Sequence, residues 1–356
     1  ETARAIREMG SNILKIALTD RYSGKHYNLP EDARIQSLVD LARLEPSVRR
    51  VLDMPFAYVF LWAYPFRQRQ GYWHDGFDEQ DRELEYREMA DLTAYLLREY
   101  SGTGKVFHIG HWEGDWHLHP DYDRKADPDP VRIQGMIDWL TCRQQAVDDA
   151  KRDTPHHDVE VYHYTEVNLV AKALEGRPCL TNSVLPHVPV DYVSYSSYDT
   201  TNPNAGDCTE ALHRALDHIE SRLTPKSGLP PGKRVFVGEY GFPLERTKTP
   251  ERQERWARDV CRAALDWGCP FVLYWELYCN EIRDGRHRGF WLIDDQSRKQ
   301  PFYFTLKRYY EWARTYRNRF RERHGRMPTQ AEFATEAIAF LENESRRPSS
   351  AKTRAP

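Results

Sequence analysis

Short apolar stretches alternate with longer, charge-patterned segments along most of the chain. The stretches that are typical of strands lie at 11–18, 56–64, 105–112, 158–167, 190–199, 233–240 and 270–277. The segments between them repeat their apolar residues at helical spacing, at about 31–44, 79–100, 130–151, up to 174, 207–222, 250–267 and 302–323. Seven strand-then-helix units in succession predict a parallel sheet covered by helices.

The number of these units favours a (β/α)8 TIM barrel over an open doubly wound sheet. The chain opens on ETARAIREMG, a helical pattern that leads straight into a strand, so we expect that a first strand precedes this sequence. With that strand the count becomes eight. A nucleotide-binding open sheet would need a glycine-rich loop that opens a helix, whereas YSGTGK at 100–105 precedes a strand. We therefore predict a barrel domain over residues 1–310.

The segment after residue 310 departs from this alternation. WARTYRNRFRERHGR carries six arginines, and Trp312, Tyr316 and Phe320 recur every four residues. A basic helix can bind nucleic acid or a membrane, but an amphipathic closing helix with a solvated basic face explains the same pattern, and we favour it. The sequence predicts a helical extension over 311–344 and a disordered tail over 345–356.

Composition narrows the class of protein further. The chain has 356 residues, of which 40% are hydrophobic and 13% aromatic, which excludes a fibrous or disordered protein. The net charge of -3 argues against a general binder of nucleic acid, and no apolar run reaches membrane-spanning length. The six cysteines lack zinc-type spacing, and their number is compatible with one disulfide. We expect neither nucleic acid nor a membrane as a partner, and a monomer.

Two glutamates stand out at the ends of predicted strands, where the functional side chains of a barrel gather. Glu113 follows KVFHIGHW and Glu239 ends KRVFVGEY. Strand alternation places both side chains on the inward-facing positions of their strands. One such glutamate is explained as well by a structural ion pair, but two together favour catalysis. Paired carboxylates suit glycosidic bond cleavage, because one protonates the leaving oxygen while the other attacks or activates water.

Several segments resemble the clan A glycoside hydrolases, which are retaining (β/α)8-barrel glycosidases. GEYGFP (238–243) resembles their nucleophile strand, HIGHWEGDW (108–116) their acid/base strand, and FVLYWEL (271–277) the eighth strand with its sugar-binding tryptophan. The resemblance covers about residues 1–310. It implies a double-displacement mechanism with Glu113 as general acid/base and Glu239 as nucleophile, carboxyl groups about 5–5.5 Å apart, a carbohydrate substrate, and neither metal nor cofactor.

The sequence departs from the clan pattern at three places. Trp112 replaces the asparagine that usually precedes the acid/base residue, so His111 or Asp115 would supply its sugar contact. Lys15 stands where an arginine is common. The tyrosine that bonds the nucleophile is either Tyr198 or Tyr195. We predict that substrate is bound by Lys15, Trp62, Trp73, His111, Trp112, Asp115, Trp116, His163, Tyr198, Trp275 and Glu276.

The loop at 65–80 and the histidines leave other readings open. Tyr72 and Trp73 are expected to cover a subsite, and Arg67 and Arg69 to meet an acidic sugar. The histidines of HIGHWEGDWHLH and HHDVEVYHY raise the alternative of a metal-dependent hydrolase, although no HExxH-type register is present. A second alternative is a barrel that binds carbohydrate without catalysis. The resemblance favours a secreted or periplasmic enzyme of polysaccharide degradation.

Overall fold

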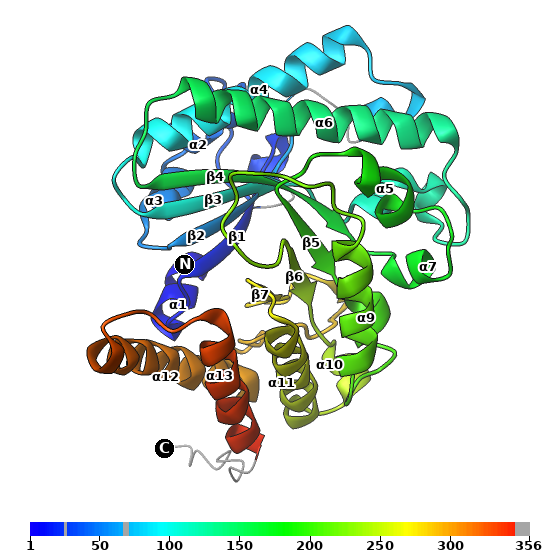
Figure 1. Ribbon diagram of the computed structural model, residues 1–356. Coiled ribbons are helices and arrows are strands. Elements are labelled where there is room, and N and C mark those ends of the chain that lie inside the picture. The colour runs from blue at the N-terminus through cyan, green and yellow to red at the C-terminus, as the bar shows by residue number, and fades with distance from the viewer. Residues whose placement is uncertain (25–26, 67–70, 346–356) are drawn as a thin grey trace. The chain divides into compact units, whose positions relative to one another are not determined.

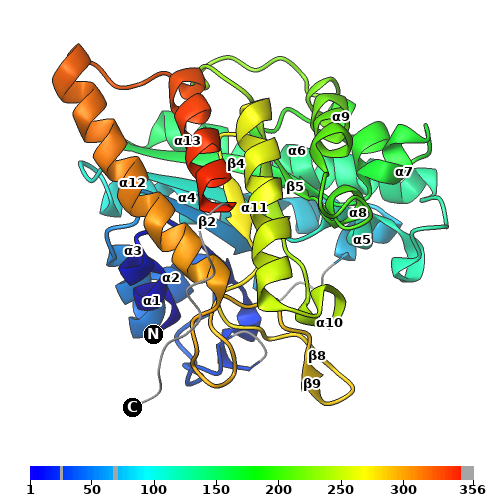
Figure 2. The same cartoon turned by 90° about the horizontal axis from the view of Figure 1, so that it is seen from below.

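A computed structural model describes residues 1–24, 27–66 and 71–345 (Figures 1 and 2). The segment 67–70, with Arg67 and Arg69, and residues 346–356 of the predicted tail lie outside the described residues. The chain divides into two compact units. The larger comprises residues 12–196 and 217–235, and the smaller comprises residues 1–11, 197–216 and 236–356.

The larger unit contains a parallel sheet in which neighbouring strands follow the order of the sequence. Its strands are β1 (Ile13–Leu18), β2 (Tyr58–Ala63), β3 (Lys105–Gly110), β4 (Val159–Val167) and β5 (Tyr192–Ser196). Leu14, Val59, Phe107 and Val161 lie side by side in register and are all buried. Apolar residues at alternate positions thus give the sheet one continuous apolar row, as expected for buried parallel strands.

Helices cover the outer side of this sheet. They are α2 (Leu38–Leu44), α3 (Pro46–Asp53), α4 (Glu79–Glu99) and α6 (Pro130–Asp153), and α4 packs along α6 (Figure 1). Shorter helices follow the strands: η1 (Asp20–Ser23), η2 (Tyr72–Asp75), α5 (Gly114–Leu118), η3 (Pro120–Tyr122), α7 (Val170–Leu174), η4 (Leu180–Val184) and η5 (Leu185–His187).

The predicted helix at 31–44 is wrong in its bounds. Helix α2 begins only after Ser37, whose side chain accepts a hydrogen bond from the backbone N–H of Asp40. A further helix, α3, follows at once, with Pro46 in its first turn and the Glu45 side chain as its cap. Proline lacks an N–H and favours the first turn of a helix, so it separates α2 from α3.

The smaller unit brings together three separate segments of the chain. It contains α1 (Thr2–Met9), α8 (Tyr198–Thr201), α10 (Leu244–Thr247), α11 (Pro250–Trp267), β7 (Val272–Tyr274), α12 (Pro301–His324) and α13 (Gln330–Ser345). The hairpin β8 (Ile282–Arg283) and β9 (Arg286–His287) follows β7. Two further elements cross the division between the units in sequence, α9 (Thr209–Glu220) and β6 (Val235–Tyr240). Strands β6 and β7 pair in parallel.

The aromatic stripe predicted after residue 310 is half-buried, and two of its rings pack on helix α13. Trp312 of α12 stacks on Phe340 of α13, and Tyr316 contacts Phe333, while α11 packs against both helices (Figure 2). The arginines of the same segment are exposed at 314, 317, 319, 321, 323 and 326. Helix α12 runs without a break through the predicted domain boundary at residue 310. None of the helices in the described part of the chain has the length and apolarity needed to cross a bilayer.

Candidate active site

Glu113 lies at the carboxyl end of β3, immediately before helix α5. Glu113 is only 7% exposed. The indole Nε1–H of Trp116, one helical turn later, donates to Glu113 Oε2 at 2.6 Å. The backbone N–H of Glu113 donates to the side-chain Oε1 of Glu166 at 3.0 Å. Both the carboxylate and the main chain of Glu113 are therefore held by side chains of the larger unit.

A glycine is required directly after Glu113. A Cβ atom on Gly114 would lie 2.6 Å from His111 Cε1, 2.5 Å from Leu180 Cδ1 and 3.0 Å from the backbone oxygen of Glu166. The two shorter contacts are closer than real Cβ contacts, so a larger residue here would force Leu180, His111 or the chain next to Glu113 to shift.

Glu166 forms the most heavily bonded polar group near Glu113. It is fully buried at the end of β4. Besides the amide of Glu113, it accepts hydrogen bonds from Lys15 Nζ at 2.8 Å, Ser194 Oγ at 2.8 Å and Ser196 Oγ at 3.2 Å. Lys15 Nζ also lies 4.3 Å from the centre of the Trp62 ring. Sequence reasoning did not predict this cluster; the signal was a lysine within the apolar strand β1 and a glutamate near the end of β4.

Three predicted substrate-binding residues are buried and bonded to the protein itself. The Asp115 carboxylate accepts the backbone N–H groups of Asn168, Leu169 and Leu180. His111 bonds Thr165 Oγ1 at 2.8 Å and the backbone oxygen of Trp112 at 3.0 Å, and His163 bonds Gln144 Oε1 at 3.2 Å. Burial holds the pKa of both histidines well below the ordinary value, so their rings are neutral. Through these contacts Asp115, His111 and His163 hydrogen-bond to the surrounding protein.

The tryptophans of the larger unit divide into two kinds. Trp62, Trp112 and Trp116 are half-buried and keep part of their rings accessible, as a stacking surface for sugars requires. Trp73 is only 1% exposed and stacks on Trp139 of α6, with ring centres 5.6 Å apart. Trp73 therefore occupies the position of a core residue.

Glu239 lies near the end of β6 and is 5% exposed. The hydroxyl of Tyr198, in α8, donates to Glu239 Oε1 at 2.9 Å. The backbone N–H of Ser197 donates to the backbone oxygen of Glu239 at 2.9 Å. Of the two tyrosines expected to bond the nucleophile, Tyr198 makes this contact, whereas Tyr195 is fully buried within β5.

Trp275 and Glu276 follow β7 and are both half-buried. The Trp275 indole Nε1–H donates to Glu281 Oε1 at 2.9 Å, and Glu276 Oε1 accepts the backbone N–H of Asn280 at 3.0 Å. Burial raises the pKa of Glu276 to about 8, and the charges of Glu281 and Glu239 add to this effect. The influence of Glu239 indicates that the two carboxyl groups belong to one neighbourhood in the smaller unit.

The described residues contain no group of three or more histidine, cysteine, aspartate or glutamate side chains placed to hold a metal ion. All six cysteines are free.

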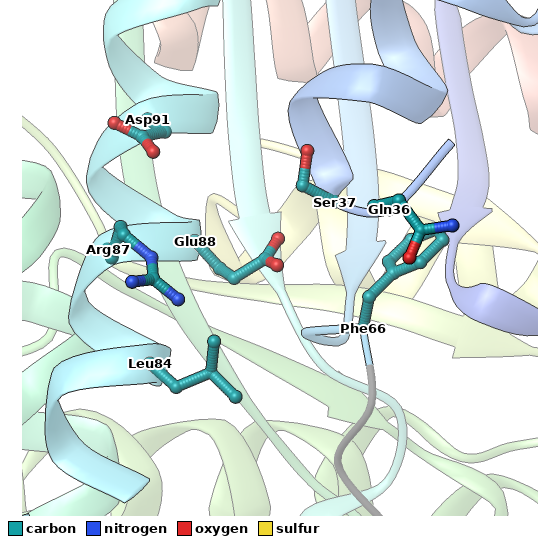
Figure 3. A pocket seen from close by; sticks show the side chains of 7 residues that line it. All are labelled: Gln36, Ser37, Phe66, Leu84, Arg87, Glu88 and Asp91. Carbon is teal, nitrogen blue, oxygen red and sulfur yellow. The ribbon is translucent and has the colours of Figure 1, made fainter. Parts of the chain in front are cut away.

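A cavity of about 180 Å³ lies on the helical side of the larger unit, between the start of α2 and helix α4 (Figure 3). Within it, Glu88 Oε2 accepts the backbone N–H of Leu38 at 2.8 Å. None of the predicted substrate-binding side chains lines it; the lining residues are Gln36, Ser37, Phe66, Leu84, Arg87, Glu88 and Asp91.

Comparison with known proteins places the fold. No protein-family model and no curated protein sequence matches the chain. Among solved structures, a β-glucosidase called 1317 is 14% identical with a TM-score of 0.54, over 87% of this chain and 86% of that one. A family 5 lichenase from Caldicellulosiruptor sp. F32 is 13% identical with a TM-score of 0.53, over 87% of this chain and 82% of that one.

A β-glucuronidase from Bifidobacterium dentium is 12% identical with a TM-score of 0.51, over 87% of this chain and 42% of that one. The chain spans only 31% of the length of β-glucuronidases from Bacteroides uniformis. At such identities the likeness concerns the fold alone. The chain has the TIM-barrel fold found in glycoside hydrolases, and the predicted fold class is confirmed.

Proposed function

We propose that the protein is a retaining glycoside hydrolase in which Glu113 is the general acid/base and Glu239 the nucleophile. The observation that supports this best is shared by the two residues. Each is a nearly buried glutamate at the end of a parallel strand, and each accepts a hydrogen bond from an aromatic side chain, Trp116 or Tyr198. In TIM-barrel enzymes this end of the strands carries the catalytic groups.

The chemistry assigned to each residue follows from the retaining mechanism. The Tyr198 hydroxyl favours the ionised form of Glu239, which attacks the anomeric carbon and forms a glycosyl ester. Glu113 gives its proton to the leaving oxygen, so that an alcohol departs. It then takes a proton from water, which attacks the ester, releases the sugar with retained configuration and restores both carboxyl groups.

We propose β-linked sugars of a poly- or oligosaccharide as substrates, with Trp112, Trp116 and Trp275 as stacking surfaces and Lys15 and Glu276 as polar contacts. Because the structural neighbours are a β-glucosidase, a lichenase and a β-glucuronidase, β-glucosides and β-glucuronides are the first compounds to test. We further propose a barrel catalytic domain up to about residue 310, a helical extension after it, and action as a monomer outside the cytoplasm.

A nucleophile trap tests the proposal. A panel of aryl β-glycosides identifies a substrate, and the matching 2-deoxy-2-fluoro glycoside is then added. We expect a covalent adduct on the peptide that contains Glu239, found by mass measurement. Glu239→Ala should lose activity by roughly 10⁴- to 10⁶-fold, and azide should restore turnover. Glu160→Gln, near the start of β4, is the control and should stay active.

A second candidate is a barrel that binds carbohydrate without catalysis. It is favoured by Trp112, which stands where the resemblance implies asparagine. Glycan binding without hydrolysis, and without an adduct from any fluorosugar, would support this candidate and contradict the first. Labelling of a residue other than Glu239 would also contradict the assignment of the nucleophile.

A further inference from the structure

We infer that Glu166, together with Lys15, is the positioning group that fixes Glu113 for proton transfer. This inference rests on the proposed function, because it concerns the residue assigned as general acid/base. Glu166 does not touch the reacting atoms in this role; it acts through the backbone of Glu113.

The contacts of Glu166 join most strands of the larger unit at one point. Lys15 comes from β1, Glu113 follows β3, Glu166 itself lies on β4, and Ser194 and Ser196 belong to β5. Four donors within 2.8–3.2 Å converge on its two oxygen atoms. An ionised carboxylate only accepts hydrogen bonds and has about four acceptor sites, so it alone matches this set of donors.

Stability does not explain why an ion pair occupies this place. Well-packed apolar residues often stabilise a core as well as a buried ion pair does, or better. What an apolar replacement cannot do is bind the N–H of Glu113 at 3.0 Å. A general acid must lie within hydrogen-bond reach of the leaving oxygen, and a displacement of about 1 Å costs roughly 100-fold in rate. The carboxylate of Glu166 therefore fixes where the strand end presents its acid.

Lys15 completes the arrangement, because its ammonium group lies 2.8 Å from the fully buried carboxylate of Glu166 and also contacts the Trp62 ring. A hydrogen bond between charged groups is stronger than one between neutral groups, so Lys15 helps to hold the Glu166 carboxylate in place.

The leaving group separates a positioning role from a merely structural one. The 2,4-dinitrophenolate leaving group departs from its glycoside without protonation. The alcohol of an alkyl glycoside departs only when the general acid protonates it. Glu166→Gln offers one acceptor oxygen in place of two, so at least two donors lose their partner. We expect its kcat/KM on the alkyl glycoside to fall about 100-fold, and the rate of glycosyl-enzyme formation from the dinitrophenyl glycoside to fall less than threefold.

Asp191→Asn is the matched control. Asp191 is also a buried carboxylate of the larger unit paired with a lysine, Lys226, but it precedes β5 and bonds the backbone of His163. This variant should affect both substrates equally. If Glu166→Gln loses the same factor on both substrates, the ratio of the alkyl to the dinitrophenyl rate stays at its wild-type value, and the inference is overturned. Lys15→Met should shift the ratio in the same direction as Glu166→Gln, and Lys15→Arg should restore it.

A measurement without substrate keeps this inference separate from the proposed function. In hydrogen exchange followed by mass measurement, Glu166→Ala should speed exchange in a peptide spanning 111–116 at least tenfold, while Asp191→Asn should not. Unchanged exchange would refute the contact regardless of activity. If the wild-type protein cleaves no glycoside but Glu166→Ala still shows the faster exchange, the proposed function is refuted. Glu166 then remains an anchor of residues 111–116.

Discussion

Glu166 in the larger unit and Glu239 in the smaller unit are buried carboxylates that are held in different ways. In the larger unit, Glu166 is paired with Lys15 at 2.8 Å and Glu85 with Arg143 at 2.8 Å. In the smaller unit, Glu239 accepts the hydroxyl of Tyr198, and Glu276 accepts a backbone amide while other carboxylates raise its pKa. Pairing with a cation fixes a charge and a position. A neutral donor gives a carboxylate a position without a countercharge, and Glu113 of the larger unit is held in this way too, by the indole of Trp116.

The largest expected effect concerns the paired charges of the larger unit. Arg143 is fully buried and donates to Glu85 and to the backbone oxygens of Ala63 and Gly110, at the ends of β2 and β3. Because Arg143→Met leaves a buried carboxylate uncompensated, we expect it to lower the free energy of unfolding by about 3–5 kcal/mol. Urea unfolding followed by circular dichroism measures this loss.

Arg152→Met, on the same helix, is the control for Arg143→Met. Arg152 is exposed and its ion pairs with Asp149 and Asp153 lie at the surface, so its loss should cost less than about 1 kcal/mol. If the two variants unfold at the same urea concentration, cation pairing does not distinguish the buried carboxylates of the larger unit.

A smaller effect is expected from the tyrosine in the smaller unit. Tyr198→Phe removes the hydroxyl that bonds Glu239 Oε1. A hydrogen bond to a charged group contributes about 1.5–3 kcal/mol, so kcat should fall roughly 10- to 100-fold, with the loss in the glycosylation step. Tyr274→Phe is the control, because the described residues offer its hydroxyl no hydrogen-bond partner. Equal kcat values for the two variants would contradict a role for Tyr198 at the nucleophile.

The last prediction concerns a pH dependence of stability. The pKa of Glu276 rises from 4.5 to about 8 on folding. The unfolded state therefore binds fewer protons than the folded state between these values, and stability falls as pH rises through this window. Glu276→Gln should flatten this fall, so that thermal unfolding at pH 8 occurs at a higher temperature than in the wild type and is similar at pH 5. The surface variant Glu322→Gln should keep the wild-type slope; an unchanged slope in Glu276→Gln would exclude the effect.

Long helices with clear N-caps were predictable from the sequence. Helices α4 and α6 begin at the predicted residues, since the side chains of Asp78 and Asp129 cap their first turns, and they end within two residues of the predicted ends. Helix α3 was missed, although Pro46 is typical of a first helical turn, and the helix predicted at 31–44 starts too early, since α2 begins only after its cap Ser37. Strand β7 is shorter than its apolar run, since backbone pairing extends only over Val272–Tyr274.

The candidate site was predictable only in its strand-end residues. The positions of Glu113 and Glu239 follow from the alternation of apolar residues along their strands, and their catalytic roles remain predictions. The framework roles of Asp115 and His111 depend on partners more than 50 positions away, such as Leu180 and Thr165, which no local pattern reveals. The same holds for Trp73, whose burial depends on its contact with Trp139.

The way the units divide the chain bears on how the protein is made. Most of the larger unit is continuous, from residue 12 to 196, and this stretch leaves the ribosome before α12 does. The smaller unit needs residues 1–11 and α12 together, since helix α1 packs against α12, where Gly10 lies against Tyr310. Because domains generally fold in order during synthesis, the smaller unit, which contains Glu239, is completed only after α12 has been made. A nascent chain halted before α12 would therefore contain the folded surroundings of Glu113, whereas the smaller unit around Glu239 would be incomplete.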